Sequence, residues 1–444
     1  MALDPKFIDL VNEKNDIVSL VTENGIVLEK AGKNYKGLCP FHADTNPSFF
    51  VSPERNLCNC FTCKTGGNPV NFYMKIKNVS FVDSIIYLAA RAGLEIPSDI
   101  KKTSVNDKFY KMYTLACAFY ETILSSSEIG KVATNYLQKR EITSKEIKKF
   151  HLGFSQTNNG LYNMLKSKGF TDNDILEAGL VVKNDNQTFI DLFRNRLMIP
   201  ITDGYGRVVA FSGRLIEKND NQPKYVNSPE SPIFKKGKTV YNIFEASDEI
   251  RKNKSVIIME GFFDLIQSYK AGIQNVVVMM GTSITPNHIS LIKEKTESVL
   301  LAFDGDDAGA KAMIKAIPHF IKASLKLEIL AFPDKLDPDE FIRQNGPENF
   351  EFLFQNNIYS PYAFIYSYYK RNLDVNDINS ITTFKAGVSE SFAHAEIIIK
   401  EQYQKQIFDE LKINIDFSSK NQVSASNYNP TPPPSLPQFT KPNT

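Results

Sequence analysis

The chain has 444 residues, and its 52 Lys and Arg residues nearly balance its 50 Asp and Glu residues, for a formal net charge of +2. A charge so close to zero excludes binding of a polyanion through overall charge alone, so any nucleic-acid binding must come from local basic patches. The hydrophobic content of 42% is ordinary for a soluble protein, and the length is enough for several domains.

Targeting and disulfide signals are missing from the sequence. Residues 1–20 carry acids and lack the basic-then-apolar start of a signal peptide. No apolar run approaches the roughly 18–20 residues that span a membrane. Four of the five cysteines lie close together and the fifth, Cys117, stands alone, which does not favour a disulfide framework. We therefore expect a reduced, cytoplasmic protein that acts as a monomer and has no membrane partner.

The first part of the chain, residues 1–96, opens and closes with helical patterns that enclose a Cys- and His-rich stretch. Residues 97–107 are polar and contain Pro97, which is typical of a linker. Residues 108–253 mix helices with a β-hairpin, whose turn is predicted at Asp203–Gly206. We expect a small metal-binding unit ahead of a larger mixed one.

Residues 254–336 alternate short apolar runs with helical stretches, which is the pattern of a buried parallel sheet. The four runs are residues 256–259, 276–280, 299–303 and 327–332. Residues 337–415 are mostly helical in pattern, and residues 416–444 are rich in proline, which predicts a disordered tail. The expected fold class is multi-domain α+β, with a Rossmann-like parallel sheet and a helical segment after it.

Two close pairs of metal-ligating residues stand near the start of the chain: Cys39 with His42, and then Cys60 with Cys63. Each pair can hold one ion from a tight turn, and thiolate and imidazole ligands favour zinc in a closed, structural site. Cys58 is a competing ligand, but a strand entering the turn would leave it one step behind Cys60. We expect one structural zinc ion with Cys58 outside its ligands. Ordinary buried cysteines are the alternative.

Around these ligands, the segments CPFHADTNPSFFV and CFTCKTGGNPVNF resemble the zinc-ribbon domain, of the CHC2 type, in DnaG-type bacterial DNA primases. The resemblance implies a ribbon that helps to engage a single-stranded DNA template, with Lys36, Arg55 and Lys64 available for phosphates. Phe49 and Phe61 could stack on bases or fill the small core of a ribbon. We interpret each of these two rings, taken alone, as a core residue.

Basic residues are spread over the stretch between residues 191 and 238. Arg194 and Arg196 are two positions apart, so an extended segment would project both from one face. The other candidates are Arg214, Lys224, Asn227 and Ser228. The stretch resembles the N-terminal half of the primase RNA-polymerase domain, which implies that these six side chains contact nucleic acid or the incoming nucleotide. A solvated basic surface is the alternative.

Acidic residues follow three of the four apolar runs. In chain order they are Glu260, Asp264, Asp304, Asp306, Asp337 and Asp339. Because the carboxyl ends of parallel strands meet at one edge of a sheet, we expect these side chains to share one crevice. Carboxylates so close repel one another, and oxygen ligands suit Mg²⁺ or Mn²⁺ as the counter-charge. For each acid taken singly, a helix cap or a solvated loop residue is the alternative.

The patterns E-G-x-x-D, D-x-D and D-P-D-E-F resemble the TOPRIM domain, which bacterial primases share with type IA and type II topoisomerases and with some nucleases. The resemblance implies that all six acids belong to the catalytic site and that Glu260, Asp304 and Asp306 bind magnesium, with two catalytic ions in all. Asp337 and Asp339 would hold the second ion or order water around it. Whether Glu260 is a metal ligand or a general base is open.

The resemblance covers roughly residues 3–415 and implies a DNA primase, a DNA-dependent RNA polymerase that starts short RNA primers de novo on single-stranded DNA during replication. Its partners would be the DNA template and nucleoside triphosphates, and its chemistry metal-assisted nucleotidyl transfer. Members of the family also dock on the replicative helicase through a helical C-terminal domain, which is not recognisable in this sequence. The open alternatives are another TOPRIM enzyme, either a topoisomerase or a nuclease, and a non-catalytic single-stranded-DNA-binding protein.

The ligand assignment predicts opposite outcomes for two neighbouring cysteines. Cys60→Ser should lose the zinc ion, because a closed site needs all four ligands, whereas Cys58→Ser should retain one zinc ion per chain. The metal content of the purified variants, measured by mass spectrometry, checks this. A Cys58→Ser protein without zinc beside a Cys60→Ser protein that keeps it would show that the ligand choice is wrong.

Overall fold

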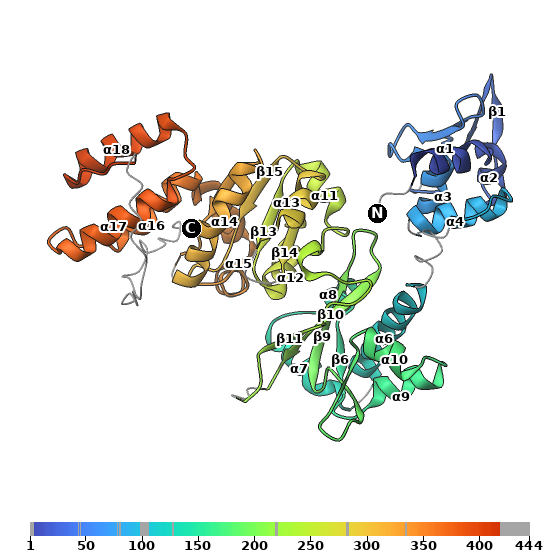
Figure 1. The fold of residues 1–444 in the computed structure, drawn as a ribbon, viewed down its shortest axis with the longest axis horizontal. Coiled ribbons are helices and arrows are strands. Elements are labelled where there is room, and N and C mark those ends of the chain that lie inside the picture. Colours follow the sequence, from blue (N-terminus) through green and yellow to red (C-terminus); the bar gives the residue numbers. More distant parts are fainter. Residues whose placement is uncertain are drawn as a thin grey trace. The chain divides into compact units, whose positions relative to one another are not determined.

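The computed structural model describes residues 4–42, 44, 46–77, 79, 81–97, 106–126, 128–217, 221–280, 284–333 and 335–417. The chain divides into two compact units, Met1–Leu115 and Ala116–Thr444, and each is described by itself. Figure 1 labels many of the elements of both units. Most of the expected linker, residues 98–105, and the expected proline-rich tail after residue 417 lie outside the described residues.

The first unit is built on a five-stranded antiparallel sheet in the order β1-β2-β3-β4-β5. The strands are β1 Glu29–Ala31, β2 Asn34–Gly37, β3 Phe49–Ser52, β4 Leu57–Cys60 and β5 Gly66–Gly67. The helices are α1 Pro5–Glu13, α2 Ile17–Glu23, α3 Pro69–Lys77 and α4 Phe81–Arg91. The predicted helical patterns at both ends of this unit are therefore confirmed.

The core of the first unit joins the helices to the sheet. Val11, Leu20 and Leu88 come from three helices and are buried together with Phe49 of β3. Asp16 starts α2, and its side chain accepts the backbone N–H of the residue three positions later, as capping aspartates do. The helices thereby support the strands that carry the Cys- and His-rich segment.

The second unit contains two larger sheets. One is antiparallel, in the order β11-β10-β9-β6, from β6 Gly153–Ser155, β9 Arg196–Thr202, β10 Val208–Leu215 and β11 Tyr225–Asn227. The β9–β10 hairpin confirms the predicted turn, in which the Asp203 N–H donates to the Arg207 carbonyl and Gly206 has a φ of 79°. A separate pair is formed by β7 Val181–Lys183 and β8 Phe189–Asp191.

The long helix α6 Asp107–Ser126 includes the end of the first unit and the start of the second. The shorter helices of the second unit that follow it are α7 Gly130–Lys139, α8 Ser144–Lys149, α9 Gly160–Ser167, α10 Asp172–Glu177 and the 3₁₀ turn η1 Lys236–Lys238. Two of them, α8 and α10, begin with capping boxes at Thr143 and Thr171, where hydroxyl and acid satisfy backbone N–H groups reciprocally.

The other sheet of the second unit has the order β12-β14-β13-β15-β16-β17. Its central strands are parallel: β14 Val276–Met279, β13 Val256–Met259, β15 Ser298–Leu301 and β16 Lys326–Leu330. The outer strands, β12 Val240–Tyr241 and β17 Ile358–Tyr359, run antiparallel to their neighbours. The predicted parallel sheet is confirmed, and each of the four predicted runs forms one of its strands.

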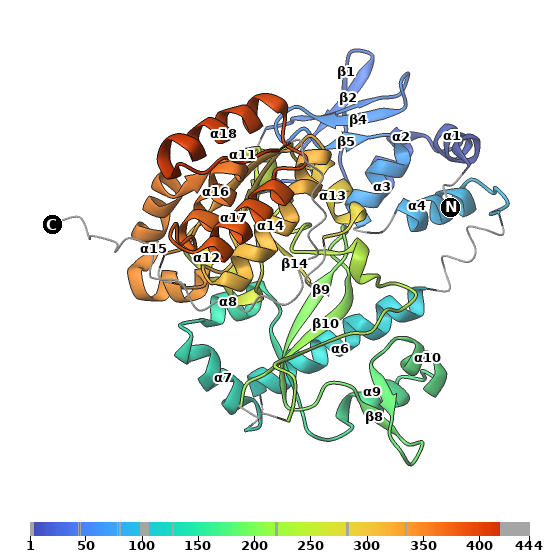
Figure 2. The same cartoon turned by 60° about the vertical axis from the view of Figure 1, so that its left-hand side comes forward.

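Helices lie on both faces of this parallel sheet (Figures 1 and 2), which is why its strands β13 and β14 are apolar and buried along their whole length. The helices are α11 Ser247–Asn253, α12 Phe262–Lys270, α13 Pro286–Lys293, α14 Asp307–Lys322 and α15 Pro338–Asn356. Val256 and Ile258 of β13 share a buried cluster with Ile292 of α13 and Ile317 of α14. On the opposite face, α12 packs against α15.

The helical segment predicted after the parallel sheet is confirmed. After α15 it comprises α16 Pro361–Arg371, α17 Ile378–Ser391 and α18 Ile397–Leu411, and α16 packs on both α14 and α17. The helix α15 is kinked at Gly346, which has a φ of 81° and is followed by Pro347. None of the helices in the described part of the chain is long and apolar enough to cross a membrane.

Gly309 lies in the first turn of α14, where the backbone packs too closely for a side chain. A Cβ atom there would come within 2.3 Å of the Asp304 carbonyl oxygen, a backbone atom that cannot easily give way. Gly309→Ala should therefore destabilise the second unit by roughly 1–3 kcal/mol and lower its Tm by several degrees. Thermal unfolding followed by circular dichroism measures the change.

Gly204→Ala is the matched control, because nothing lies within 4 Å of the Cβ that it would add. Its Tm should equal that of the unmodified protein. Equal Tm values for the two glycine variants would contradict the close packing at Gly309.

Candidate functional site

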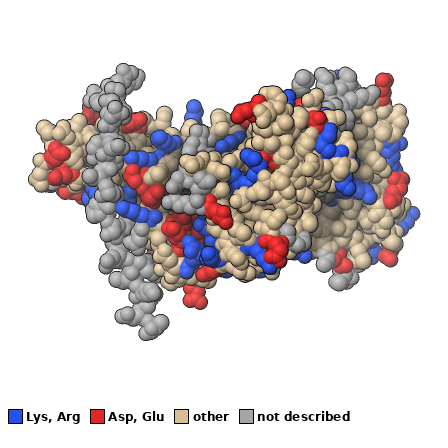
Figure 3. Space-filling model, turned by 90° about the horizontal axis from the view of Figure 1, so that it is seen from below, with Lys and Arg blue, Asp and Glu red and all other residues tan. Residues whose placement is uncertain are grey.

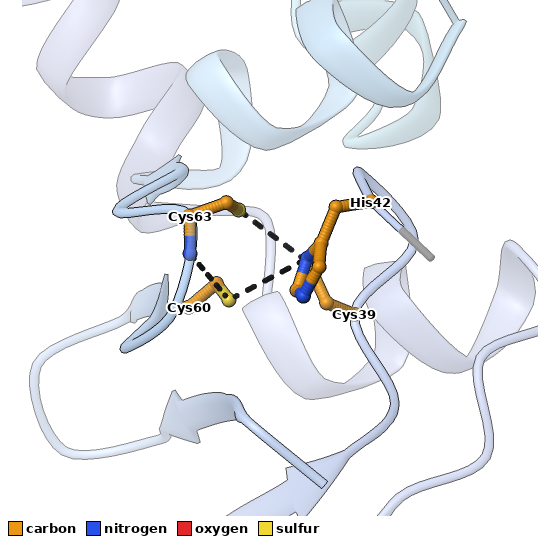
Figure 4. A group of neighbouring side chains, drawn as sticks. All are labelled: Cys39, His42, Cys60 and Cys63. Atoms are coloured by element: carbon orange, nitrogen blue, oxygen red, sulfur yellow. Dashed lines mark hydrogen bonds between the residues drawn. The ribbon is translucent and has the colours of Figure 1, made fainter. Parts of the chain in front are cut away.

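Four metal-ligating side chains meet in the first unit: Cys39, His42, Cys60 and Cys63 (Figure 4). Their ligand atoms all lie within 4.8 Å of one another. The sulfurs of Cys39 and Cys63 are 3.7 Å apart, and the Cys60 sulfur is 3.9 Å from Nδ1 of His42. Three sulfurs and one imidazole nitrogen form the donor set of a structural zinc ion. The structure thus brings together the four residues that the spacing selects.

Asp44 holds the loop that carries two of these ligands. Its Oδ2 accepts hydrogen bonds from the Cys39 N–H at 2.9 Å and from the Ser48 hydroxyl at 2.6 Å. Its Oδ1 lies 3.8 Å from Nε2 of His42. A carboxylate beside the outer nitrogen of a ligating histidine orients the ring, which leaves Nδ1 for the metal. Sequence reasoning missed Asp44, although an acid two positions after the histidine was a usable signal.

Hydrogen bonds favour the thiolate form of Cys60. Burial alone would raise the pKa of Cys60, but the Ser48 hydroxyl, 3.2 Å from the sulfur, and the Cys63 N–H, 3.3 Å away, lower the pKa to about 6. The thiolate is the form that binds metal. Cys58 is different: its sulfur lies 3.5 Å from the Gly67 carbonyl, and burial raises its pKa to about 11. Cys58 therefore stays outside the group, as the spacing predicts.

The two aromatic residues singled out in the ribbon have different environments. Phe49 is fully buried against Phe72, so a core role is confirmed for it. Phe61 is 59% exposed, so the core interpretation is wrong for this ring. It lies in the metal-binding turn just after β4, edge-on to Phe50 and 5.9 Å from the Lys64 ammonium group. An exposed aromatic ring beside a cation suits stacking on a nucleic-acid base.

The six predicted acids follow the parallel strands of the second unit. Glu260 comes directly after β13, Asp304 shortly after β15, and Asp337 immediately before α15. Since β13, β15 and β16 are parallel neighbours, these residues lie at one edge of the sheet, beyond the carboxyl ends of its strands. The topology therefore supplies the arrangement that the sequence pattern predicts.

The acids at this edge act on one another. Burial, and then the charge of Glu260, raises the pKa of Asp304 to about 7, and Asp337 and Asp306 add to the rise. Partial burial raises the pKa of Glu260 as well, although its side chain reaches solvent, and the charge of Asp306 adds to the rise. Burial also raises the pKa of Asp337. Each raised pKa means that the protein makes ionisation of the group less favourable, and a bound cation would offset the repulsion.

One oxygen at the acidic edge fits a cation in particular. Oδ1 of Asp304 is buried and has no hydrogen-bond partner among the described residues. Together with Glu260 and Asp306 it offers an all-oxygen donor set, which suits Mg²⁺ or Mn²⁺. The carboxylates are less tightly gathered than the zinc ligands. Among the described residues, three or more ligand atoms of Cys, His, Asp or Glu lie within 4.8 Å of one another only in the Cys–His group, and not among the carboxylates.

Two of the acids also cap helices. Oδ1 of Asp306 accepts the Gly309 N–H at 2.8 Å at the start of α14, and Oδ1 of Asp337 accepts the Glu340 N–H at 2.6 Å at the start of α15. The alternative considered for single acids is therefore correct for these two residues. A cap uses one oxygen of a carboxylate, so the second oxygen stays available for a metal ion.

Asp264 and Asp339 are engaged by other parts of the protein. The two oxygens of Asp264 accept the N–H groups of Gly261 at 2.8 Å and of Asp339 at 3.2 Å, which joins the turn after β13 to the start of α15. Asp339 is only 1% exposed, and its carboxylate pairs with Arg140 and, at 3.1 Å, with Arg343. These two acids fix the acidic turns against each other.

Arg140 is a residue that sequence reasoning missed. Besides pairing with Asp339, its guanidinium group lies 4.6 Å from the centre of the Phe263 ring. Arg214, from β10, lies 4.6 Å from the same ring and donates to the Tyr225 hydroxyl at 2.6 Å. Two arginines from different elements therefore meet on one aromatic ring beside the acids. Arg140 directly follows Lys139, and this sequence context does not distinguish it from an ordinary surface residue.

Arg194 and Arg196 do not share a face, contrary to the prediction. Arg194 is exposed, whereas Arg196 is only 4% exposed. Asn195, between them, has a φ of 53°, and this left-handed residue breaks the strand alternation. The guanidinium of Arg196 donates to the carbonyls of Gly213 at 3.1 Å and Pro223 at 3.0 Å. It therefore ties backbone segments together.

The segment around β11 contains both exposed and buried candidates. Lys224 and Asn227 are exposed. Ser228 is buried, and its hydroxyl accepts the Phe211 N–H at 2.9 Å, so it serves the antiparallel sheet. The charge of Lys224 opposes the rise in the pKa of Asp304 that burial and the neighbouring acids cause.

The surface charges are mixed. Figure 3 shows one face of the protein on which Lys and Arg side chains are interspersed with Asp and Glu. This distribution agrees with the formal net charge of +2. Contacts to a polyanion would therefore depend on individual side chains such as Arg194 and Lys224.

Comparison with known proteins places each part of the chain. The family model of the CHC2 zinc finger matches residues 3–104, that of the N-terminal domain of the DNA primase catalytic core matches residues 119–247, and a Toprim-like model matches residues 257–342. A DNA primase from Staphylococcus epidermidis is 36% identical over 96% of this chain and 74% of its own length. The chain belongs to the DnaG-type DNA primase family.

Solved structures of primases agree with this assignment. The zinc-binding and RNA polymerase domains of the Aquifex aeolicus primase are 32% identical, with a TM-score of 0.59 over 92% of this chain and 97% of that one. A DnaG primase catalytic domain bound to single-stranded DNA is 28% identical, with a TM-score of 0.56 over 70% of this chain and 98% of that one. The primase resemblance and the expected multi-domain fold are confirmed.

The raised pKa of Asp304 leads to a prediction about the stability of this primase-family chain without added divalent cations. The folded-state pKa of about 7 lies above the ordinary value of 3.8, so ionisation of Asp304 destabilises the fold as the pH rises through this interval. Asp304→Asn, which cannot ionise, should have a higher Tm than the unmodified protein. The gain should be largest above about pH 7 and should shrink as the pH falls toward about 4.

Magnesium and a second variant provide the controls. At about pH 8, added Mg²⁺ should raise the Tm of the unmodified protein, because a ligand that binds only the native state stabilises that state. Added Mg²⁺ should have little effect on the Tm of Asp304→Asn. Glu297→Gln changes an exposed acid at the opposite end of β15 and should behave like the unmodified protein. An Asp304→Asn protein whose Tm equals that of the unmodified protein at every pH would show that ionisation of Asp304 does not destabilise the fold.

Proposed function

We propose that this chain is a DNA primase that makes short RNA primers de novo on single-stranded DNA during replication. It acts as a nucleotidyltransferase: the 3′-hydroxyl of one nucleotide attacks the α-phosphate of the next nucleoside triphosphate, and pyrophosphate leaves. One observation carries the proposal: the acids that follow the parallel strands lie at one edge of the sheet, where Oδ1 of Asp304 is buried and has no hydrogen-bond partner among the described residues. This arrangement suits a divalent cation.

The acids and the basic residues have distinct proposed roles. Glu260, Asp304 and Asp306, with Asp337 nearby, would hold two Mg²⁺ or Mn²⁺ ions. When bound, such ions lower the pKa of an attacking hydroxyl and neutralise a triphosphate. Glu260 is exposed at the strand end, a position open to a metal ligand and to a general base alike.

The remaining polar residues would position the substrates. The exposed side chains of Arg194, Lys224 and Asn227 offer hydrogen-bond donors to template or nucleotide phosphates. Arg214 is half-buried and tied to Tyr225, so its proposed contribution is to shape the wall beside the acids. In the first unit, the zinc group would hold the turn in which Phe61 and Lys64 face solvent, ready for single-stranded DNA.

Further properties follow from the proposed function. The substrates would be nucleoside triphosphates, the location the cytoplasm, and the active species a monomer. A replicative helicase is a partner expected from the family alone. The related catalytic domain solved with single-stranded DNA supports such DNA as the template. We also propose the domain boundaries expected from the sequence, which fall after residues 96, 107, 253, 336 and 415.

The alternative functions have less support. A topoisomerase or nuclease needs no basic segment before the parallel sheet, and residues 119–247 match the primase catalytic core in particular. A non-catalytic DNA-binding protein would gain nothing from several acids held close together with raised pKa values. The primase function explains both features.

A primer-synthesis assay tests the proposal. With single-stranded DNA, nucleoside triphosphates and Mg²⁺, the protein should make short RNA products. Asp304→Ala should reduce their yield by roughly 100-fold or more, because it removes a metal ligand worth several kcal/mol in the transition state. Gel analysis of labelled products measures the yield.

Glu297→Ala, at the opposite end of the same strand, is the control and should retain full activity. DNA cleavage or relaxation without nucleoside triphosphates would contradict the proposal. Undiminished primer synthesis by Asp304→Ala would remove this acid from the catalytic site.

A further inference from the structure

Helix α16 forms one wall of the acidic site. A cavity of about 40 Å³ lies between this helix and the turn after β15. Asp304 and Asp306 line it from the turn, and Tyr368 and Arg371 line it from α16. The same helix packs on α14, which begins directly after Asp306 (Figures 1 and 2). Two side chains of the helical segment therefore face the acids proposed to bind the catalytic ions.

Tyr368 is hydrogen-bonded to the acidic turn. It is largely buried, and its hydroxyl donates to Oδ1 of Asp307 at 2.8 Å. The ammonium group of Lys311 lies 2.8 Å from Oδ2 of the same carboxylate. Asp307 follows Asp306 directly in the chain, so whatever holds Asp307 also limits the movement of the backbone from which Asp306 projects.

Arg371 lies near the turn after β15 but makes no hydrogen bond or ion pair to its described residues. Its guanidinium group lies 5.0 Å from the centre of the Tyr368 ring, and its Nε is buried with no hydrogen-bond partner in the described part of the chain. Oδ1 of Asp304, on the opposite side of the cavity, is buried and unpartnered too. The cavity is large enough for a water molecule, and a water between a donor and an acceptor satisfies both.

We propose that Tyr368 and Arg371 are positioning residues for the catalytic metal ligands. Tyr368 acts through Asp307, and Arg371 acts through water in the cavity, so that Asp304 and Asp306 are held ready for a divalent cation. The inference rests on the proposed function, because it takes these two acids as metal ligands. It makes the helical segment part of the metal site.

Manganese binding to the zinc-loaded full-length chain tests the proposal. Tyr368→Phe removes a hydroxyl and keeps the ring, and Arg371→Gln removes a charge. Each should weaken Mn²⁺ binding by roughly 3–10-fold. Losing one hydrogen bond to a charged group has a larger effect than this, but only part of that effect reaches the metal ligands. Electron paramagnetic resonance of free Mn²⁺ measures the affinity. Arg371→Lys keeps the charge and should recover part of the loss.

Two neighbours on the same helix are matched controls. The Tyr369 hydroxyl lies 3.4 Å from the Ser391 hydroxyl, and Lys370 pairs with Glu410. Tyr369→Phe and Lys370→Gln should therefore bind Mn²⁺ as the unmodified protein does. In primer synthesis, Tyr368→Phe should raise the Mg²⁺ concentration needed for half-maximal rate and leave the rate at saturating Mg²⁺ nearly unchanged.

Unchanged Mn²⁺ affinity in both Tyr368→Phe and Arg371→Gln would overturn the proposal. An equal loss in all four single variants, controls included, would also overturn it, because helix α16 would then act only as scaffold. The binding measurement needs neither template nor nucleotides. If the proposed function is wrong, the unmodified protein will bind Mn²⁺ but make no primers. This outcome differs from failure of the positioning role, which the Mn²⁺ affinities of the variants report.

Discussion

Carboxylates at the edge of a parallel sheet repel one another, and burial strengthens the repulsion because less water screens it. The second unit contains specific partners that limit this effect. Asp264 accepts two backbone N–H groups, and Asp339 is paired with Arg140 and Arg343. Asp304, in contrast, has an oxygen without a partner among the described residues. The protein thus stabilises some acids through its own groups, whereas Asp304 lacks such partners, and a cation is the counter-charge proposed for it.

The zinc ligands and the acidic edge are assembled in different ways. The zinc ligands come from two short turns within 25 consecutive positions, so their spacing in the sequence already reports their closeness. The acidic edge depends on strand order: the bond from Asp339 to Asp264 joins residues 75 positions apart. A local site can hold its shape once its sheet and turns form. A non-local site needs the whole parallel sheet and the start of α15 in place.

The difference between local and non-local contacts also explains which features could be predicted from the sequence. Strand runs, helix patterns and the Cys and His spacing are local, and they predicted the parallel sheet, the helical end and the zinc group. The acids were found because strand ends meet at one edge. The exposure of Phe61 depends on how a single turn faces solvent. The roles of Arg140 and Arg371 depend on partners far away in the chain, and no periodicity records such contacts.

The burial of Arg196 affects how mutations in this chain should be interpreted. Its guanidinium group holds the carbonyls of Gly213 and Pro223, so alanine at this position would leave two backbone oxygens without their donor. A defective variant would then report damage to the scaffold and say little about DNA contact. Arg194, on the other side of the left-handed Asn195, is exposed, and its replacement probes the surface itself. Two arginines that stand two positions apart in the sequence thus answer different experimental questions.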